Sequence, residues 1–242
     1  MQRRPTWTAG WLTTVTVVCV IASATTLAAQ DFTVRMQDED GKISTHYVSR
    51  HAVRNVSSTP VETDVIYRLD QGKMITLNHQ QKTYTETTLA EARQHMEKRT
   101  SEMDPQEQEM MRRLGMAGAA ASITKIGAGE TIAGYATEKY SAKTPLSQGK
   151  IWVAPALEIP PGYYDLVTSF VAREVAGLGQ LFKEMQGKQV KGFALKWVTT
   201  SSLPMMKGVT VTQVATSVET GSIPASTFEP PAGYQKVRAQ GS

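Results

Sequence analysis

The sequence predicts an α+β fold in which an antiparallel β-meander, curved or closed, is accompanied by helices that can cover it. Three observations predict this class. Short runs that alternate between apolar and polar residues are separated by turn signals through the first third of the chain. Two later segments carry apolar residues at helical spacing instead. Strand-like alternation returns after each of them, without a linker or an internal repeat, so residues 30–242 are expected to form a single domain.

The first 29 residues predict a secretory signal peptide. Arg3 and Arg4 give a positive start, residues 11–27 are uncharged and mostly apolar, and small residues end the segment at Ala29, before Asp31. An uncleaved anchor helix is the alternative. Threonines dilute the apolar run, however, and it is only marginally long enough to cross a bilayer. We therefore expect a periplasmic or secreted protein that is cleaved near Ala29.

Composition narrows the classes of partner. The formal net charge is +4 and 40% of the residues are hydrophobic, which is enough for a packed core. Loss of Arg3 and Arg4 leaves a nearly neutral chain with interspersed acids and bases, so no nucleic-acid partner is expected. Cys19 is the only cysteine, and it lies within the apolar segment after Val18, which is not the small residue of a lipoprotein signal. The exported chain would contain no disulfide and no thiolate chemistry.

The meander comes first in the exported chain. Each expected strand alternates in polarity, and turn signals such as Asp40-Gly41 separate the strands. A segment that packs across the edge of the sheet is expected at residues 228–234, where Pro230 and Pro231 exclude a central strand. The strands of the meander are expected at residues 32–36, 43–48, 53–57, 63–69, 74–78 and 83–86.

A helical insertion is predicted at about residues 88–118. Thr88 followed by Glu91 is a capping box, in which the hydroxyl and the carboxylate satisfy free backbone N–H groups at the start of a helix. Asp104 and Pro105 interrupt this helix and suit the start of another. The insertion therefore reads as a bent pair of helices.

The second half of the chain is organised around residues 129–155, which read as strand, turn, strand, loop and strand, with the loop at residues 144–149. A second helix is predicted at about residues 164–186, bent by internal glycines. Two more strands follow at residues 193–202 and 209–218. The second changes parity between Val211 and Val214, which predicts a β-bulge.

Catalytic and metal-binding patterns are missing from the sequence. There is no Gly-x-Ser-x-Gly, no P-loop and no dinucleotide fingerprint. The four histidines, which are His46, His51, His79 and His95, have no ligand spacing, and His79 reads as a solvated turn residue. We therefore expect no enzymatic activity, no cofactor and no metal.

The candidate ligand-binding residues are apolar. Methionine is unbranched and polarizable, so a methionine-rich helical insertion can form a soft lid over a cavity that takes acyl chains. The alternative is ordinary packing under a two-helix cover, which the residues alone favour, because methionine commonly fills gaps in a core. The candidates are Met96, Met103, Met110, Met111 and Leu114 from the insertion, together with Trp152, Phe170 and Trp197.

Four blocks carry a family resemblance: KMITLNHQQKTYTE (73–86), GETIAGYATEKY (129–140), GKIWVAP (149–155) and FEPPAGYQKV (228–237). In this order they resemble an uncharacterised family of exported bacterial proteins, a domain of unknown function of the 4412 type, similar to the LolA/LolB-like lipoprotein-carrier superfamily. The resemblance implies a strongly curved antiparallel sheet, an incomplete barrel, with helices covering its concave face. Carriers of that superfamily bind acyl chains between sheet and helices. The family itself has no established activity, so no residue roles are carried over.

The resemblance implies a non-enzymatic protein that binds an apolar ligand, either a lipid or the acyl chains of a lipoprotein, and that is at most peripheral to the membrane. The alternative is a structural or protein-interaction module of the envelope, whose partner is another envelope protein and whose concave face is plugged and ligand-free.

Overall fold

The computed structural model describes residues 30–57, 63–106, 109, 121–171, 178–203 and 206–238. The expected signal peptide, residues 1–29, lies outside the described residues, as does nearly all of the expected second part of the helical insertion after Pro105.

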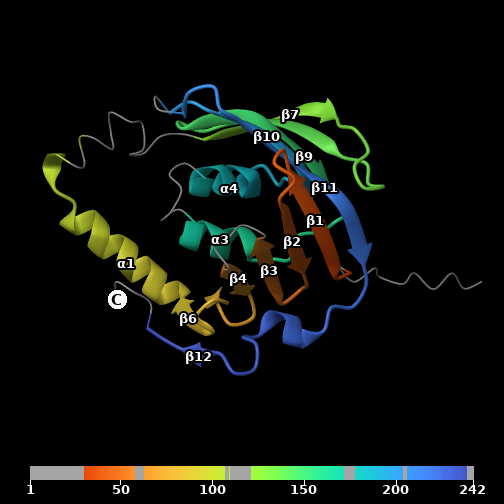
Figure 1. The fold of residues 1–242 in the computed structure, drawn as a ribbon. Coiled ribbons are helices and arrows are strands. Elements are labelled where there is room, and N and C mark those ends of the chain that lie inside the picture. The colour runs from red at the N-terminus through yellow and green to blue at the C-terminus, as the bar shows by residue number, and fades with distance from the viewer. Residues whose placement is uncertain are drawn as a thin grey trace, which may run out of the picture.

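The described residues form one sheet of 12 strands, in the order β12-β6-β5-β4-β3-β2-β1-β11-β10-β9-β8-β7. The sheet is curved but not closed, and its pairs are antiparallel except for the short β12, which pairs with β6 in parallel (Figure 1). The fold is therefore mixed α+β, as predicted. The strands are β1 (Phe32–Asp38), β2 (Ile43–Val48), β3 (Ala52–Ser57), β4 (Thr63–Arg68), β5 (Lys73–Asn78), β6 (Thr83–Thr88), β7 (Ser122–Ala128), β8 (Glu138–Lys143), β9 (Ser147–Ala154), β10 (Phe193–Ser201), β11 (Thr210–Thr220) and β12 (Gln235–Lys236).

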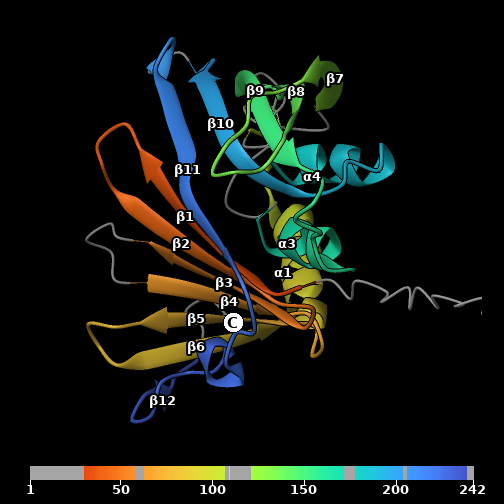
Figure 2. The same cartoon turned by 90° about the vertical axis from the view of Figure 1, so that its right-hand side faces the viewer.

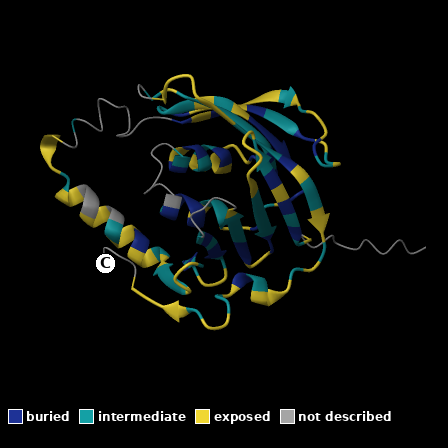
Figure 3. Ribbon diagram, in the orientation of Figure 1, coloured by how far each residue is buried: buried dark blue, intermediate teal, exposed yellow. Residues whose placement is uncertain are grey.

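Within the described residues, three α-helices accompany the sheet: α1 (Leu89–Glu102), α3 (Tyr163–Val171) and α4 (Leu178–Gly187). Figure 1 shows α3 and α4 inside the curve of the sheet, and Figure 2 shows α1 and α3 on one side of the wall formed by β1 to β6. Buried residues concentrate in α3, α4 and the strands around them (Figure 3). In the part of the chain that the structure describes, no helix has the length and apolar character needed to cross a membrane.

The start of α1 confirms the predicted capping box. The backbone N–H of Glu91 donates to the Thr88 hydroxyl at 3.2 Å, and the Glu91 carboxylate accepts from the Thr88 backbone N–H at 2.7 Å. Two free N–H groups of the first turn are thus satisfied, which fixes where the chain leaves β6.

Two details differ from the sequence expectation. Residues 144–149 were expected to form a loop, but β9 begins at Ser147 after a turn closed by the bond from Thr144 N to Ser147 O at 2.8 Å. Gly149 belongs to this strand because the backbone of Val198 leaves no room for a Cβ there, so the glycine signals close strand approach rather than a loop. The bulge of β11 lies opposite Arg35 and Met36 of β1, nearer the end of the strand than predicted.

The C-terminal segment covers the outer face of strands β3 to β6. The short 3-10 helix η2 (Ala225–Phe228) places Phe228, which is buried, against Ile66, Ile75 and Leu77. Parallel pairing of β12 with β6 then closes that edge of the sheet. The predicted packing of residues 228–234 across the edge agrees with this arrangement.

Candidate functional site

The inner face of the sheet is an apolar surface held against α3. Alternate residues of β1, Phe32, Val34 and Met36, point to the same face, as the period of two of a strand requires. They belong to one buried cluster with Leu166 and Phe170 of α3. Among the described residues, this cluster is the largest of three buried apolar clusters, and it lines the inner face.

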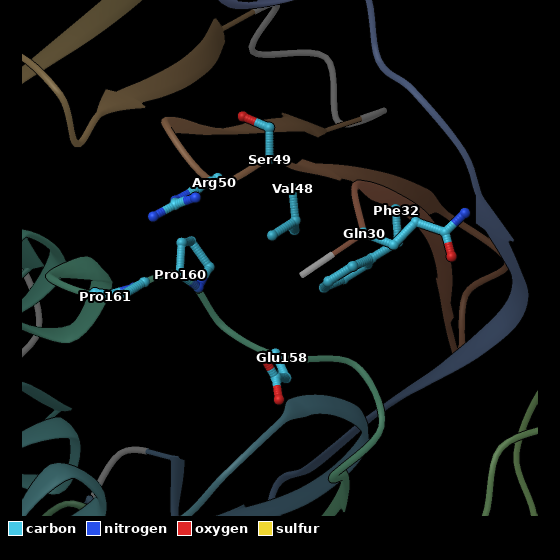
Figure 4. A pocket seen from close by; sticks show the side chains of 8 residues that line it. All are labelled: Gln30, Phe32, Val48, Ser49, Arg50, Glu158, Pro160 and Pro161. Atoms are coloured by element: carbon cyan, nitrogen blue, oxygen red, sulfur yellow. The ribbon is translucent and has the colours of Figure 1, made fainter. Parts of the chain in front are cut away.

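A pocket of about 270 Å³ opens at the rim of this cluster (Figure 4). Phe32 and Val48, which face each other across β1 and β2, form its apolar wall and are also members of the inner-face cluster. The pocket thus continues the apolar inner face toward solvent. Its lining consists of Gln30, Phe32, Val48, Ser49, Arg50, Glu158, Pro160 and Pro161.

Local structure fixes the two sides of the pocket. Ser49 holds the β2–β3 turn, because its hydroxyl donates to the Ala52 carbonyl oxygen at 3.1 Å. On the other side, Pro160 and Pro161 stiffen the entry to α3, and Gly162 takes the positive φ of 80° that ends this turn. The polar side chains of Arg50 and Glu158 come from these opposite sides, so the pocket has an apolar wall and a charged mouth.

A polar group lies in the middle of the inner face. His46 Nδ1 is 2.9 Å from Asn55 Oδ1, its Nε2 is 3.4 Å from the Ser44 hydroxyl, and its ring contacts Phe193 edge-on at 5.6 Å. Burial lowers the pKa of His46, so the imidazole is held neutral. With Asn55 Oδ1 as the acceptor, Nδ1 carries the proton. The mostly apolar inner face therefore contains a hydrogen-bonded polar cluster, formed by a neutral His46 with Asn55 and Ser44.

The structure divides the predicted ligand-binding aromatics between two buried clusters. Phe170 is buried in the inner-face cluster, with its ring centroid 6.4 Å from that of Tyr67. Trp197 packs against a second cluster around Leu181 of α4. Trp152 lies on the face of β9 turned away from α4, since it pairs with Lys196, but it is buried in the same cluster as Phe170. Phe170 and Trp152 therefore share one buried cluster, and Trp197 packs against another.

The predicted lid residues are mostly beyond what the structure describes. Met110, Met111 and Leu114 lie outside the described residues. Met96 lies in α1, but its side chain is not described. Met103 is the C-cap of α1 and is partly exposed. The lid therefore stays a prediction.

Sequence reasoning missed a polar network on the outer face. Asp64 has only 4% of its side chain exposed and accepts from the guanidinium of Arg54, with Nε at 3.1 Å. His79 Nε2 lies 3.0 Å from the same carboxylate, and His79 Nδ1 lies 2.6 Å from the Tyr234 hydroxyl. The expectation that His79 is a solvated turn residue is wrong: its side chain is 28% exposed and bonded on both nitrogens.

This network connects distant parts of the chain. Arg54 also donates to the carbonyl oxygen of Thr227 at 2.9 Å, and Arg68 binds both Asp70 and Glu229. The network thereby fastens the C-terminal segment to β3, β4 and the β5–β6 turn. The signal in the sequence was Arg54 and Asp64 on the same face of neighbouring strands, but the partner in the C-terminal segment could not be anticipated from spacing.

The described residues contain no group of three or more His, Cys, Asp or Glu side chains arranged to hold a metal ion. The buried Asp64 carboxylate is instead occupied by the Arg54 guanidinium and the His79 ring.

Comparison with known proteins identifies one family. Residues 44–234 match the model of a family described as Domain of unknown function (DUF4412). No curated protein matches the chain.

Solved structures give weak likenesses. An uncharacterized conserved protein from Thermus thermophilus has a TM-score of 0.48 at 6% identity, over 87% of this chain and 91% of that one. A structure of PNGF-II in a C2 space group has a TM-score of 0.47 at 11% identity. That match covers 87% of this chain, but the chain spans only 31% of PNGF-II.

Proposed function

The chain belongs to the DUF4412 family, and on that premise we propose that it is a non-enzymatic periplasmic or secreted protein that binds an apolar ligand, a lipid or a lipoprotein acyl chain, between its curved sheet and its helices. The observation that carries the proposal is the pocket at the rim of the inner face. Its wall residues Phe32 and Val48 are also part of the inner-face core, so a ligand that enters continues the core rather than resting on the surface.

The chemistry of the pocket favours an amphiphile. Its wall is apolar, and burial of apolar ligand surface is worth about 25 cal/mol per Å². Arg50 and Glu158 at the mouth offer hydrogen bonds and charge to a polar head that stays near solvent. A volume of about 270 Å³ lies near the lower end of the range for ligand pockets, so it accommodates part of a long chain. The remainder of such a chain would extend along the inner face beneath the helices.

The resemblance of the sequence to the LolA/LolB-like lipoprotein carriers supports the same proposal, because it implies the same architecture. A curved sheet whose concave face is covered by helices places an apolar surface where acyl chains can enter without exposure to water. The helical insertion at about residues 88–118 then acts as the lid over that surface.

One observation favours the alternative, an envelope structural or protein-interaction module with a plugged face. Leu166, Val167 and Phe170 of α3 are buried against the sheet and already occupy a large part of the inner face. In that case the pocket at the rim is a packing defect, and no ligand accompanies the protein.

A blocking variant separates the two functions. Glu158 is exposed at the mouth of the pocket, so Glu158→Trp narrows the entrance without a change in the core. We expect the wild type to bind a fluorescent fatty acid and Glu158→Trp to lose most of that binding at an unchanged melting temperature. Glu39→Trp changes an exposed glutamate in the turn between β1 and β2, outside the pocket and the proposed lid, so it is the control and keeps wild-type binding. Equal binding by all three proteins, or none by the wild type, contradicts the pocket as the entrance.

A further inference from the structure

The face of β8, β9 and β10 that is turned away from α4 is basic. The register of these strands aligns Lys139 with Trp152 and Lys196, and the next outward positions include Lys150 and Lys143. The other positions of this face on the same strands are Ser141, Gln148, Val198 and Thr200, so none is acidic. We call Lys139, Lys143, Lys150 and Lys196 the lysine face.

Trp152 organises one end of the lysine face. The ammonium groups of Lys139 and Lys196 lie 4.8 Å and 4.7 Å from the centroid of its ring, one on each neighbouring strand. Such contacts hold both lysines close to the sheet. Lys196 is neutralised by Glu130 at 2.6 Å.

The other three lysines of the lysine face have no acidic partner among the described residues, so their charges are available to bind an anionic surface. Among the described residues, no carboxylate lies within ion-pair distance of Lys139, Lys143 or Lys150. Like charges on one sheet face repel each other, so this arrangement is unfavourable for the isolated fold. An anionic surface would relieve the repulsion.

An exposed apolar hairpin tip adjoins the lysine face. Met206 is 49% exposed and Val209 is 46% exposed, with Lys207 between them at the turn from β10 to β11. The tip is placed beside the turn that follows Lys143, because Ser202 N donates to Leu146 O at 2.8 Å. Apolar residues next to several lysines match the two layers of a bilayer interface, the acyl boundary and the anionic headgroups.

We propose that this end of the sheet, the lysine face with the hairpin tip, docks on the surface of an anionic phospholipid bilayer. The lysines contact the headgroups and Met206 and Val209 enter the interface. The docking surface lies on the side of β8 to β10 turned away from α4, and none of its lysines or tip residues lines the pocket. The inference does not depend on ligand binding in the pocket.

Vesicle co-sedimentation tests the charge component. The protein is purified from its own host, and its intact mass is measured to define which form is used. It is then mixed with phosphatidylcholine vesicles that either contain or lack phosphatidylglycerol. We expect binding only to the anionic vesicles, falling as salt increases. Lys143→Gln combined with Lys150→Gln lowers the partition coefficient on the order of tenfold or more, since each lysine near an anionic surface contributes. The matched control, Lys98→Gln with Lys183→Gln, changes two exposed helical lysines and keeps wild-type binding.

The apolar component is tested separately. Met206→Ser combined with Val209→Ser weakens binding to the anionic vesicles, whereas Val237→Ser, an exposed valine at the far end of the sheet, does not. All these side chains are exposed, so the melting temperatures stay within a few degrees of the wild type. Equal binding to neutral and anionic vesicles, or full binding by the double lysine variant, overturns the proposal. Binding to a soluble polyanion such as heparin without vesicle binding also overturns it and points to a polyanionic macromolecule instead.

Discussion

At the scale of single residues, the most constrained charges lie outside the proposed ligand site. Asp64 is almost fully buried, and its carboxylate is shared by the Arg54 guanidinium and the His79 ring. A buried charge is tolerated only when it is paired and hydrogen-bonded. We therefore interpret this network as structural: it holds the C-terminal segment against the sheet.

Asp64→Asn should be strongly destabilising. The substitution leaves the Arg54 guanidinium, 16% exposed, without its compensating charge, which costs about 3–5 kcal/mol of unfolding free energy. Urea denaturation measures the change. Asp40→Asn is the control, since Asp40 pairs with Lys42 in the open and its loss should leave the midpoint unchanged. Equal effects of the two substitutions would refute the buried network.

Removal of the Tyr164 hydroxyl is predicted to stabilise the protein, in contrast to Asp64→Asn. Its hydroxyl is buried with no hydrogen-bond partner in the described structure, and burial raises its pKa. Tyr164→Phe removes an unsatisfied polar atom and should raise the unfolding free energy by about 1 kcal/mol. Tyr140→Phe is the matched change, because the Tyr140 hydroxyl donates to Glu138 at 2.6 Å and its removal should destabilise. Urea midpoints that move in the same direction for both would contradict this account.

At the scale of elements, helix starts and hairpin turns are determined by residues that are close together in the sequence. The Thr88 capping box, the Asp40-Gly41 turn and most strand ranges were predictable because each depends on residues within a few positions of one another. The start of β9 was missed because a glycine is needed at position 149 to make room for the backbone of Val198, which is distant in the sequence, and not to form a local turn. The C-terminal network was missed for the same reason, since Tyr234 meets His79 across 155 positions.

The candidate site, too, could be predicted only where it depends on residues that are close together in the sequence. Helical spacing predicted an apolar face that includes Phe170, and Phe170 lies with Trp152 in the inner-face cluster. Alternation could not tell that Trp152 and Trp197 point to opposite faces, because an unpaired Leu195 shifts the register of β10 against β9. The pocket was not predictable either, since its two sides come from Val48 and Pro160, which lie far apart in the sequence.

The cap of α1 can be tested directly. Thr88→Ala removes the hydroxyl that accepts from the Glu91 backbone N–H, which should cost about 1 kcal/mol. Amide hydrogen exchange should show faster exchange in the first turn of α1, whereas Thr88→Ser should restore protection. Unchanged exchange in the alanine variant would show that tertiary contacts, not the cap, hold this end of the helix.

The edge formed by β12 and β6 should depend on pH through Glu86. Lys236 and Lys73 hold the pKa of this carboxyl below its ordinary value. The folded-state pKa is lowered, so the contribution to stability is present above the ordinary pKa of about 4.5 and is lost as the pH falls through the lowered value. The stability difference between wild type and Glu86→Gln should therefore be largest near neutral pH and shrink in acid. A constant difference from neutral to acid pH would be inconsistent with that linkage.

At the scale of the whole molecule, the curved sheet separates two surfaces with different chemistry. The inner face is apolar and meets α3 and α4, whereas the outer face carries the C-terminal segment at one end and the lysine face at the other. This division fits the function and the docking surface that we propose, because it provides an apolar site shielded from water and a separate basic surface. The amount of inner face already filled by α3 decides whether a ligand enters.

Native mass spectrometry of the protein purified from its own envelope tests the central claim most directly. If the inner face and its pocket hold an apolar ligand, the spectrum contains a second species, heavier by the mass of a lipid or an acyl chain, which disappears after delipidation and returns when lipid is added. Glu158→Trp should carry less of this species than the control variant Glu39→Trp. A single species at the mass of the bare chain, before and after lipid is added, would contradict the binding function and leave the plugged structural module.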